Sequence, residues 1–199
     1  REVVESMRPI LMGKFKSAAP KGTSWDVITQ TIKKSLYDFV LGLEGAGVLE
    51  GDSRNIETIS GMQGSTQHLE NAALVLEVLL EAAAPFVEMS DDLGVFIESG
   101  TAILQDMKQW VIWLKHAGMP MPPEQKPLVR WISRSRSEAR LTVTPLDIAE
   151  PFSRMMNLRK ETAWVFTSAT MAVGDGEFKH FTQALGIEGA EEHAWNSPF

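Results

Sequence analysis

Apolar side chains recur every three or four residues through the first 118 residues, which is the spacing of one face of a helix. The clearest helix is predicted after Ser24, because serine caps helices and Asp26 suits the first turn. Gly45 and Gly47 predict where this helix ends. Its apolar face consists of Val27, Ile28, Ile32, Leu36, Phe39, Val40 and Leu43.

Two more long helices are predicted by the same spacing. Ser65 is the expected cap of the first, which Pro85 interrupts. Residues 90–92 open the second, and Gly118 closes it. A short helix is expected near Asn55, in the glycine-rich segment between the long helices. Antiparallel packing is the economical way to bury three such faces. The two further faces are Leu69, Ala72, Ala73, Leu76, Leu79, Leu80 and Ala83, and Leu93, Phe96, Ile97, Leu104, Met107, Val111 and Leu114.

The pattern changes after the proline-rich residues 119–123, which read as a boundary. Near alternation of apolar and polar residues now predicts strands, and the run 164–166 is typical of a strand buried on both faces. Strands that alternate with short helices indicate part of an α/β sheet, with too few strands for a complete domain. The predicted elements are strands at 128–133, 139–144 and 164–166, a turn at 135–137, and helices at 148–156 and 177–185.

Charge is distributed unevenly along the 199 residues, whose formal net charge is −7. Residues 1–122 hold 10 basic and 16 acidic side chains, whereas residues 126–160 hold 8 basic and 3 acidic ones. An acidic helical part followed by an arginine-rich stretch favours two units with different partners, although a solvated face is the plainer interpretation. The longest apolar run is too short and too interrupted for a membrane span.

Catalytic and metal-binding patterns are missing from the sequence. It has no cysteine, which excludes thiolate metal sites and cysteine nucleophiles. It has no G-x-x-x-x-G-K-[ST] phosphate loop and no dinucleotide fingerprint. The four histidines lie far apart, so we predict no catalytic, metal or cofactor-binding residues. The one dense motif is a set of hydroxyls after the run 164–166, namely Thr167, Ser168 and Thr170 around Ala169. Function gathers at such strand ends in open α/β sheets.

Three segments, in this order, resemble the DinG/XPD-type superfamily 2 DNA helicases, nearest their YoaA-like branch. Residues 141–152, LTVTPLDIAEPF, resemble the family's L-x-x-T-P-L-x-V-A-x-x-F. Residues 163–171, AWVFTSATM, resemble helicase motif III, with Met171 in place of the usual leucine. Residues 178–187, FKHFTQALGI, followed by Ser197-Pro198-Phe199, resemble the segment that leads into the second motor domain. Residues 1–122 carry no motif that is specific to the family. They resemble it only in being helical, at the place where the family inserts a helical domain.

The resemblance implies a mainly α fold, in which an antiparallel helical arch-type bundle precedes a small partial α/β, RecA-like segment. Residues 1–122 would form the arch domain, and residues 123–199 the end of motor domain 1 with motif III. The chain would be an internal piece of an ATP-dependent DNA helicase, inactive alone, that acts in DNA repair or replication. The absence of an initiating methionine and the abrupt end fit such a piece.

Cofactors and partners follow from the same resemblance. No cofactor is expected in this piece, whereas ATP, Mg²⁺ and a 4Fe-4S cluster are expected in the parent protein. The parent's partners would be single-stranded or forked DNA and a replication or repair protein, with no membrane. Its location would be cytoplasmic, with activity at the bacterial nucleoid. In this piece the strands would lack the neighbouring strands of the whole enzyme, so their edges would be exposed. Dimerisation through these exposed edges is a further expectation.

Residue roles are carried over only where the motifs match. By the resemblance, Thr167, Ser168, Ala169 and Thr170 are the motif III residues that couple nucleotide state to DNA grip. The alternative is that these hydroxyls simply cap a strand end. The arginine-rich stretch is expected to lie near the DNA, with Arg130, Arg134, Arg136 and Arg140 as the candidate contacts. Trp131 either stacks on a base or packs in the core or hairpin.

Two other classes of protein compete with the helicase interpretation. A helical protein–protein interaction module without motor function would use an exposed Trp110/Trp113 pair to meet its partner. A small-molecule binding domain would hold an apolar pocket between the helices. The hydroxyl motif in its ordered setting favours the helicase, because an adaptor has no need of it.

Overall fold

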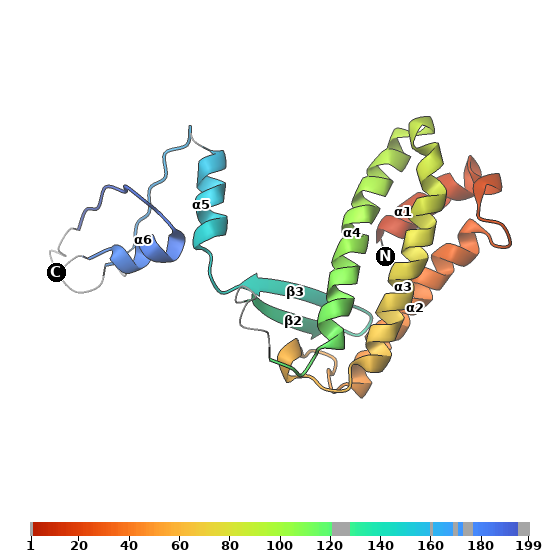
Figure 1. Cartoon of the computed structure of the whole chain (residues 1–199), viewed down its shortest axis with the longest axis horizontal. Coiled ribbons are helices and arrows are strands. Elements are labelled where there is room, and N and C mark those ends of the chain that lie inside the picture. Colours follow the sequence, from red (N-terminus) through yellow and green to blue (C-terminus); the bar gives the residue numbers. More distant parts are fainter. Residues whose placement is uncertain (1, 121–127, 160, 169–170, 173–176, 195–199) are drawn as a thin grey trace. The chain divides into compact units, whose positions relative to one another are not determined.

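The computed structural model describes residues 2–120, 128–159, 161–168, 171–172 and 177–194 (Figure 1). The chain divides into two compact units. The helical unit contains the described residues up to 120 together with Arg130–Val143, and the C-terminal unit contains those from Thr144 onward, with residues 128 and 129. Six α-helices and three strands are present in the described ranges, so the prediction of a mainly α fold with a small strand-containing part is confirmed.

In the described residues, the helical unit is built from four α-helices (Figure 1). They are α1 (Glu2–Gly13), α2 (Trp25–Gly45), α3 (Gln63–Ala83) and α4 (Asp91–Lys115). Helix α3 packs against both α2 and α4, while α1 packs against α2 and α4. Short 3₁₀ helices occupy Lys16–Ala18, Ile56–Thr58 and Ala84–Met89. The last of these contains Pro85, which ends α3 as predicted.

The helix starts test the predicted caps. Ser24 is confirmed, because its Oγ accepts a hydrogen bond of 3.3 Å from the Val27 N–H. Ser65 is wrong as a cap, since α3 begins two residues earlier, at Gln63. Met62 is buried in the core, and its carbonyl accepts bonds from the Thr66 N–H and hydroxyl at 2.8 and 2.7 Å. Burial of Met62 therefore draws the first turn of α3 inward and places Ser65 inside the helix.

Two groups of buried apolar residues form the core of the helical unit. The first joins α1 to the facing parts of α2, α3 and α4, and includes Leu11, Trp25, Ile32, Leu79 and Leu93. The second lies around the other ends of these helices and includes Leu43, Ile56, Leu114 and Ile132. Because Ile132 comes from the strands, this second group attaches the sheet to the helices.

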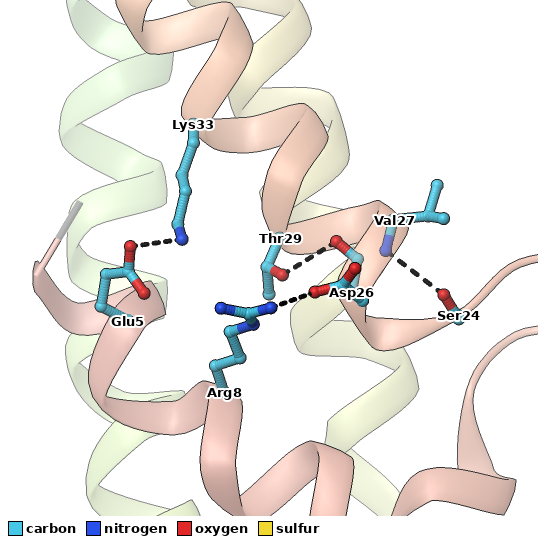
Figure 2. Close-up of polar contacts among 7 residues, drawn as sticks. All are labelled: Glu5, Arg8, Ser24, Asp26, Val27, Thr29 and Lys33. Carbon is cyan, nitrogen blue, oxygen red and sulfur yellow. Dashed lines mark hydrogen bonds and ion pairs between the residues drawn. The ribbon is translucent and has the colours of Figure 1, made fainter.

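Helix α1 is held on α2 by two ion pairs as well as by apolar packing (Figure 2). The Arg8 guanidinium binds the Asp26 carboxylate at 2.5 Å, and the Lys33 ammonium binds the Glu5 carboxylate. Each pair therefore joins one charge on α1 to the opposite charge on α2. The pairs are partly exposed, so solvent screening leaves the buried apolar side chains as the main source of stability.

A very close approach of α2 and α3 occurs at Gly42. A Cβ atom added at this position would lie 2.6 Å from the Ser65 Oγ and 3.4 Å from the Ser65 Cα. The Ser65 Oγ is itself buried, and no described residue forms a hydrogen bond with it. The two small residues thus fix the distance between the helices.

We expect Gly42→Ala to lower the free energy of unfolding by about 1–3 kcal/mol, because the added methyl group overpacks this contact. Adding Ser65→Ala removes the clashing oxygen and a buried hydroxyl without a partner. The double variant should therefore be about 1 kcal/mol more stable than the wild type, through the helix propensity of alanine. Urea denaturation of the wild type and the three variants measures this double-mutant cycle. If the effects of Gly42→Ala and Ser65→Ala on the free energy of unfolding are additive, the two residues do not limit the distance between the helices.

The sheet has three strands, in the order β1-β2-β3. They are β1 (Ser53–Asn55), β2 (Leu128–Arg134) and β3 (Ala139–Pro145). Strand β1 runs antiparallel to β2, with Ser53 opposite Ser133 and Asn55 opposite Trp131. The two predicted strands of the hairpin are confirmed, each one residue longer than expected. Strand β1 was not predicted, because a three-residue strand forms only where an existing strand offers it an edge.

The C-terminal unit contains helices α5 (Ala149–Leu158) and α6 (Lys179–Leu185), close to the predicted ranges. Gly186 ends α6 with a φ of +62°, as its position predicts. The predicted strand at 164–166 is wrong, because these residues pair with no described strand and the Val165 side chain is 83% exposed. An apolar run becomes a buried strand only when neighbouring strands cover it.

Candidate functional site

The residues that resemble motif III lie beside an open hollow of the C-terminal unit. Its volume is about 650 Å³, and its lining includes Thr167, Ser168 and Met171, together with His180 and Phe181 of α6. Thr167 and Ser168 are both exposed. The remaining predicted coupling residues, Ala169 and Thr170, lie outside the described residues.

Aromatic contacts position this segment within its unit. The Phe166 ring lies 5.5 Å from the Phe181 ring of α6 and 5.9 Å from the Phe152 ring of α5, measured between centroids. The Trp164 ring also contacts Phe152, at 6.3 Å. Residues 164–166 therefore bridge the two helices through alternate side chains, and Thr167 and Ser168 follow directly where this support ends.

The C-terminal unit has a thin core. Of its described residues, none is as well buried as the core of the helical unit. Leu158 and Val165 are almost fully exposed. The Trp164 Nε1 is buried, yet no acceptor among the described residues reaches it. A buried indole N–H normally finds a hydrogen-bond partner, so the Trp164 Nε1 is an exception within the described part of this unit.

The four candidate DNA-binding arginines separate into two pairs. Arg130 and Arg134 are buried, at 6% and 8% exposed, because alternate residues of β2 face the helices. Arg136 lies in the turn between β2 and β3, Arg140 lies on β3, and both are exposed. The structure thus brings the four residues onto one hairpin but onto different sides of it. DNA contact remains a prediction for all four.

The buried arginines bind the helical unit. The Arg130 Nη2 donates to the Glu57 Oε1 at 3.0 Å, and its guanidinium lies 5.5 Å from the centre of the Trp113 ring. The Arg134 Nη1 donates to the Val48 carbonyl at 2.9 Å, and its Nη2 to the Glu44 Oε2 at 3.1 Å. The three hydrogen bonds join residues at least 73 positions apart along the chain, so local sequence patterns gave no indication of them.

The tryptophan pair of the competing interaction module is not an exposed surface. Trp110 is buried and its ring meets that of Trp113 edge to face, 5.1 Å between centroids. Trp113 packs against the second group of core residues and lies under Arg130. The prediction of an exposed pair is therefore wrong, because the hairpin covers this part of α4.

Other kinds of site find no support in the part of the chain that the structure describes. Within these ranges no three acidic or histidine side chains gather as metal ligands would. None of the described helices combines the length and the apolar character that crossing a membrane requires.

The similarity of this chain to known proteins points to DNA helicases. The ATP-dependent DNA helicase YoaA of Haemophilus influenzae is 29% identical over 186 residues, which cover 94% of this chain and 26% of that protein. The protein of the same name from Escherichia coli is 42% identical over 69 residues, 35% of this chain and 10% of the relative. The resemblance to YoaA-like helicases is thereby confirmed. No family model matches the chain, and no solved structure matches it.

The chain spans about a quarter of the Haemophilus protein and a tenth of the Escherichia coli protein. The longer of these matches runs through nearly all of the chain, so it includes most of the helical unit as well as the motif-bearing segments. The helical unit thus shares in the similarity, although it carried no specific motif.

Proposed function

We propose that this chain is the arch and motif III region of an ATP-dependent DNA helicase. The observation that carries the proposal is the similarity to a protein of that name over 94% of the chain. Residues 1–122 would supply the arch, and residues 123–199 the returning end of the first, RecA-like motor domain. The parent protein would move along single-stranded DNA and unwind duplexes during DNA repair or replication, in the cytoplasm.

The C-terminal unit supports a role as part of a larger domain. Its apolar residues are thinly covered and the Trp164 N–H has no acceptor among the described residues. Both features are expected where a neighbouring part of a motor domain packs against this unit. Thr167 and Ser168 stand at the edge of the open hollow, where they would hydrogen-bond to a segment seated there. Such bonds would link nucleotide state to the grip on DNA.

The chain does not itself fit the helicase cofactors. It has no cysteine for an iron–sulfur cluster and no phosphate loop for ATP and Mg²⁺. These groups would be bound by other parts of the parent protein. What this chain would contribute is the placement of the motif III hydroxyls, and no catalytic residue.

Exchanging the corresponding region of the Haemophilus helicase for this chain tests the proposal. We expect the chimera to hydrolyse ATP in response to single-stranded DNA and to unwind a forked duplex. The double substitution Thr167→Ala and Ser168→Ala should reduce unwinding per ATP hydrolysed by about tenfold or more, because hydrogen bonds that couple the domains are lost. Steady-state ATPase and strand-separation assays give the two rates.

The matched control replaces two hydroxyls of the same unit that neither line the hollow nor belong to the three matching segments, Ser153 and Thr162, by alanine. This control should keep the coupling of the parent chimera. A soluble, folded chimera that neither hydrolyses ATP nor unwinds DNA would overturn the helicase proposal. Equal coupling in both double variants would instead remove the role of Thr167 and Ser168.

A further inference from the structure

The hairpin of β2 and β3 presents two chemically different sides. Along β2, residues 130, 132 and 134 are buried against the helical unit, and on β3 Ala139 and Leu141 pack against the same core. The residues between them point the other way. Trp131 is 37% exposed and Arg140 is exposed, so both belong to the solvent-facing side of the sheet.

The buried side holds the hairpin firmly in place. Arg130 binds Glu57, and Arg134 binds Glu44 and the Val48 carbonyl, all within the helical unit. On the other side of the sheet, strand β1 adds the exposed Ser53–Ser133 hydroxyl contact of 2.9 Å. Since these bonds fix both the strand direction and the side that is buried, the solvent-facing side is pre-organised before any ligand arrives.

The solvent-facing side combines an aromatic ring with positive charge. Arg140 shares it with Trp131, and Arg136 is exposed in the adjoining turn, where Glu138 is the accompanying acidic residue. Asn55, opposite Trp131 in the register, adds an amide. Residues 1–122 carry a net charge of −6, so these arginines form a local positive site on an acidic unit. The positive charge of these arginines favours an anionic ligand on this side of the sheet.

We propose that this side of the sheet, formed by Trp131, Arg136 and Arg140, is a contact site for single-stranded DNA. The indole ring would stack on one base, and the two guanidinium groups would bind neighbouring phosphates. Stacking needs an unpaired base, which is why single-stranded DNA fits this site better than duplex. The choice of DNA as the ligand rests on the proposed function. This proposal narrows the predicted DNA contacts to Arg136 and Arg140, and makes the buried Arg130 and Arg134 positioning residues that hold the hairpin.

The test measures binding of the 199-residue chain to a fluorescein-labelled 20-nucleotide oligothymidine by fluorescence anisotropy, over a series of salt concentrations. Trp131→Ala should weaken binding by about tenfold through the loss of one stacked base. The double substitution Arg136→Ala and Arg140→Ala should reduce the slope of log affinity against log salt by about 1.4, or 0.7 for each lost phosphate contact. Trp131→Phe should keep most of the affinity, since it keeps a ring.

Matched controls come from exposed residues elsewhere. Tyr37→Ala removes an exposed ring from α2, and the pair Arg154→Ala and Arg159→Ala removes two exposed arginines from the C-terminal unit. Both should leave affinity and salt slope unchanged. Circular dichroism shows whether Trp131→Ala changes the fold. If it does, the salt slope of the double arginine variant alone decides whether this side of the sheet binds DNA.

Several outcomes would overturn the site. One is an oligothymidine affinity that is the same in the wild type, in Trp131→Ala and in the double arginine variant. Another is a wild-type chain that binds no oligothymidine. Neither outcome affects the chimera assays of ATP hydrolysis and unwinding. An active chimera combined with either outcome would show a helicase whose DNA strand binds at another surface. If the control variants lower the oligothymidine affinity more than the Trp131 and arginine variants do, the DNA contact lies elsewhere and not on this side of the sheet.

Discussion

Trp25→Ala is expected to lower the free energy of unfolding of the helical unit by about 3–5 kcal/mol, the range for removing a large buried aromatic side chain. Trp25 is 2% exposed at the first residue of α2, within the core group that joins all four helices. Its Nε1 donates a 2.7 Å hydrogen bond to the Phe15 carbonyl, which the substitution leaves without this donor. Urea denaturation followed by circular dichroism at the helix band measures the change.

Two companion variants separate the causes. Trp25→Phe keeps an aromatic ring but removes the N–H, and should lose less than half as much stability as Trp25→Ala. Tyr37→Ala, on an exposed part of the same helix, should change stability by less than about 0.5 kcal/mol. A loss below about 1 kcal/mol for Trp25→Ala would mean that α1 and the Phe15 turn unfold independently of the other helices.

Gly118→Ala is expected to lower the free energy of unfolding by about 2–4 kcal/mol, for two reasons that add. Gly118 has a φ of +79°, a conformation that places strain on any residue with a Cβ, by about 1–2 kcal/mol. A Cβ here would also lie 2.9 Å from the Ile59 carbonyl oxygen, which belongs to the backbone and cannot swing aside. The Gly118 N–H donates to the Ile56 carbonyl at 3.0 Å, so the residue cannot move away without losing that bond.

Gly61→Ala is the matched control for this prediction. Gly61 has nearly the same φ, +76°, but a Cβ added there would meet no atom within 4 Å. It should therefore show the backbone strain alone. The difference between the two variants, measured by the same urea denaturation, isolates the contact between the end of α4 and the Ile56–Ile59 segment. Equal losses would show that this contact adds nothing.

The helices were predictable because their causes are local. The apolar spacing after Ser24, the cap itself and the glycines at the end all act within a few residues, and α2 follows them closely. The same holds for the alternation that predicted β2 and β3. The prediction that Ser65 caps a helix was wrong, because a serine before an apolar run is typical of a cap, whereas burial of Met62 determines where α3 begins.

The candidate site was predictable only in part, since burial of its residues depends on distant partners. Four arginines in one stretch look alike in the sequence, yet Glu44 and Glu57 draw two of them inward. The run 164–166 has the composition of a buried strand, but no described strand pairs with it. The motif III hydroxyls were recognised by resemblance to a family, because a few hydroxyls after an apolar run are common in proteins.

The sheet has a consequence for the order in which the chain folds. Helices α2, α3 and α4 contact neighbours in sequence, so they can pack as soon as they leave the ribosome. Strand β1 must wait, because Ser53 meets Ser133 only after 80 more residues have been made, and Glu44 meets Arg134 after 90. Contacts between such distant residues form slowly, since the long intervening loop must first be closed. The helical bundle is therefore expected to form first, and docking of the hairpin to complete the unit.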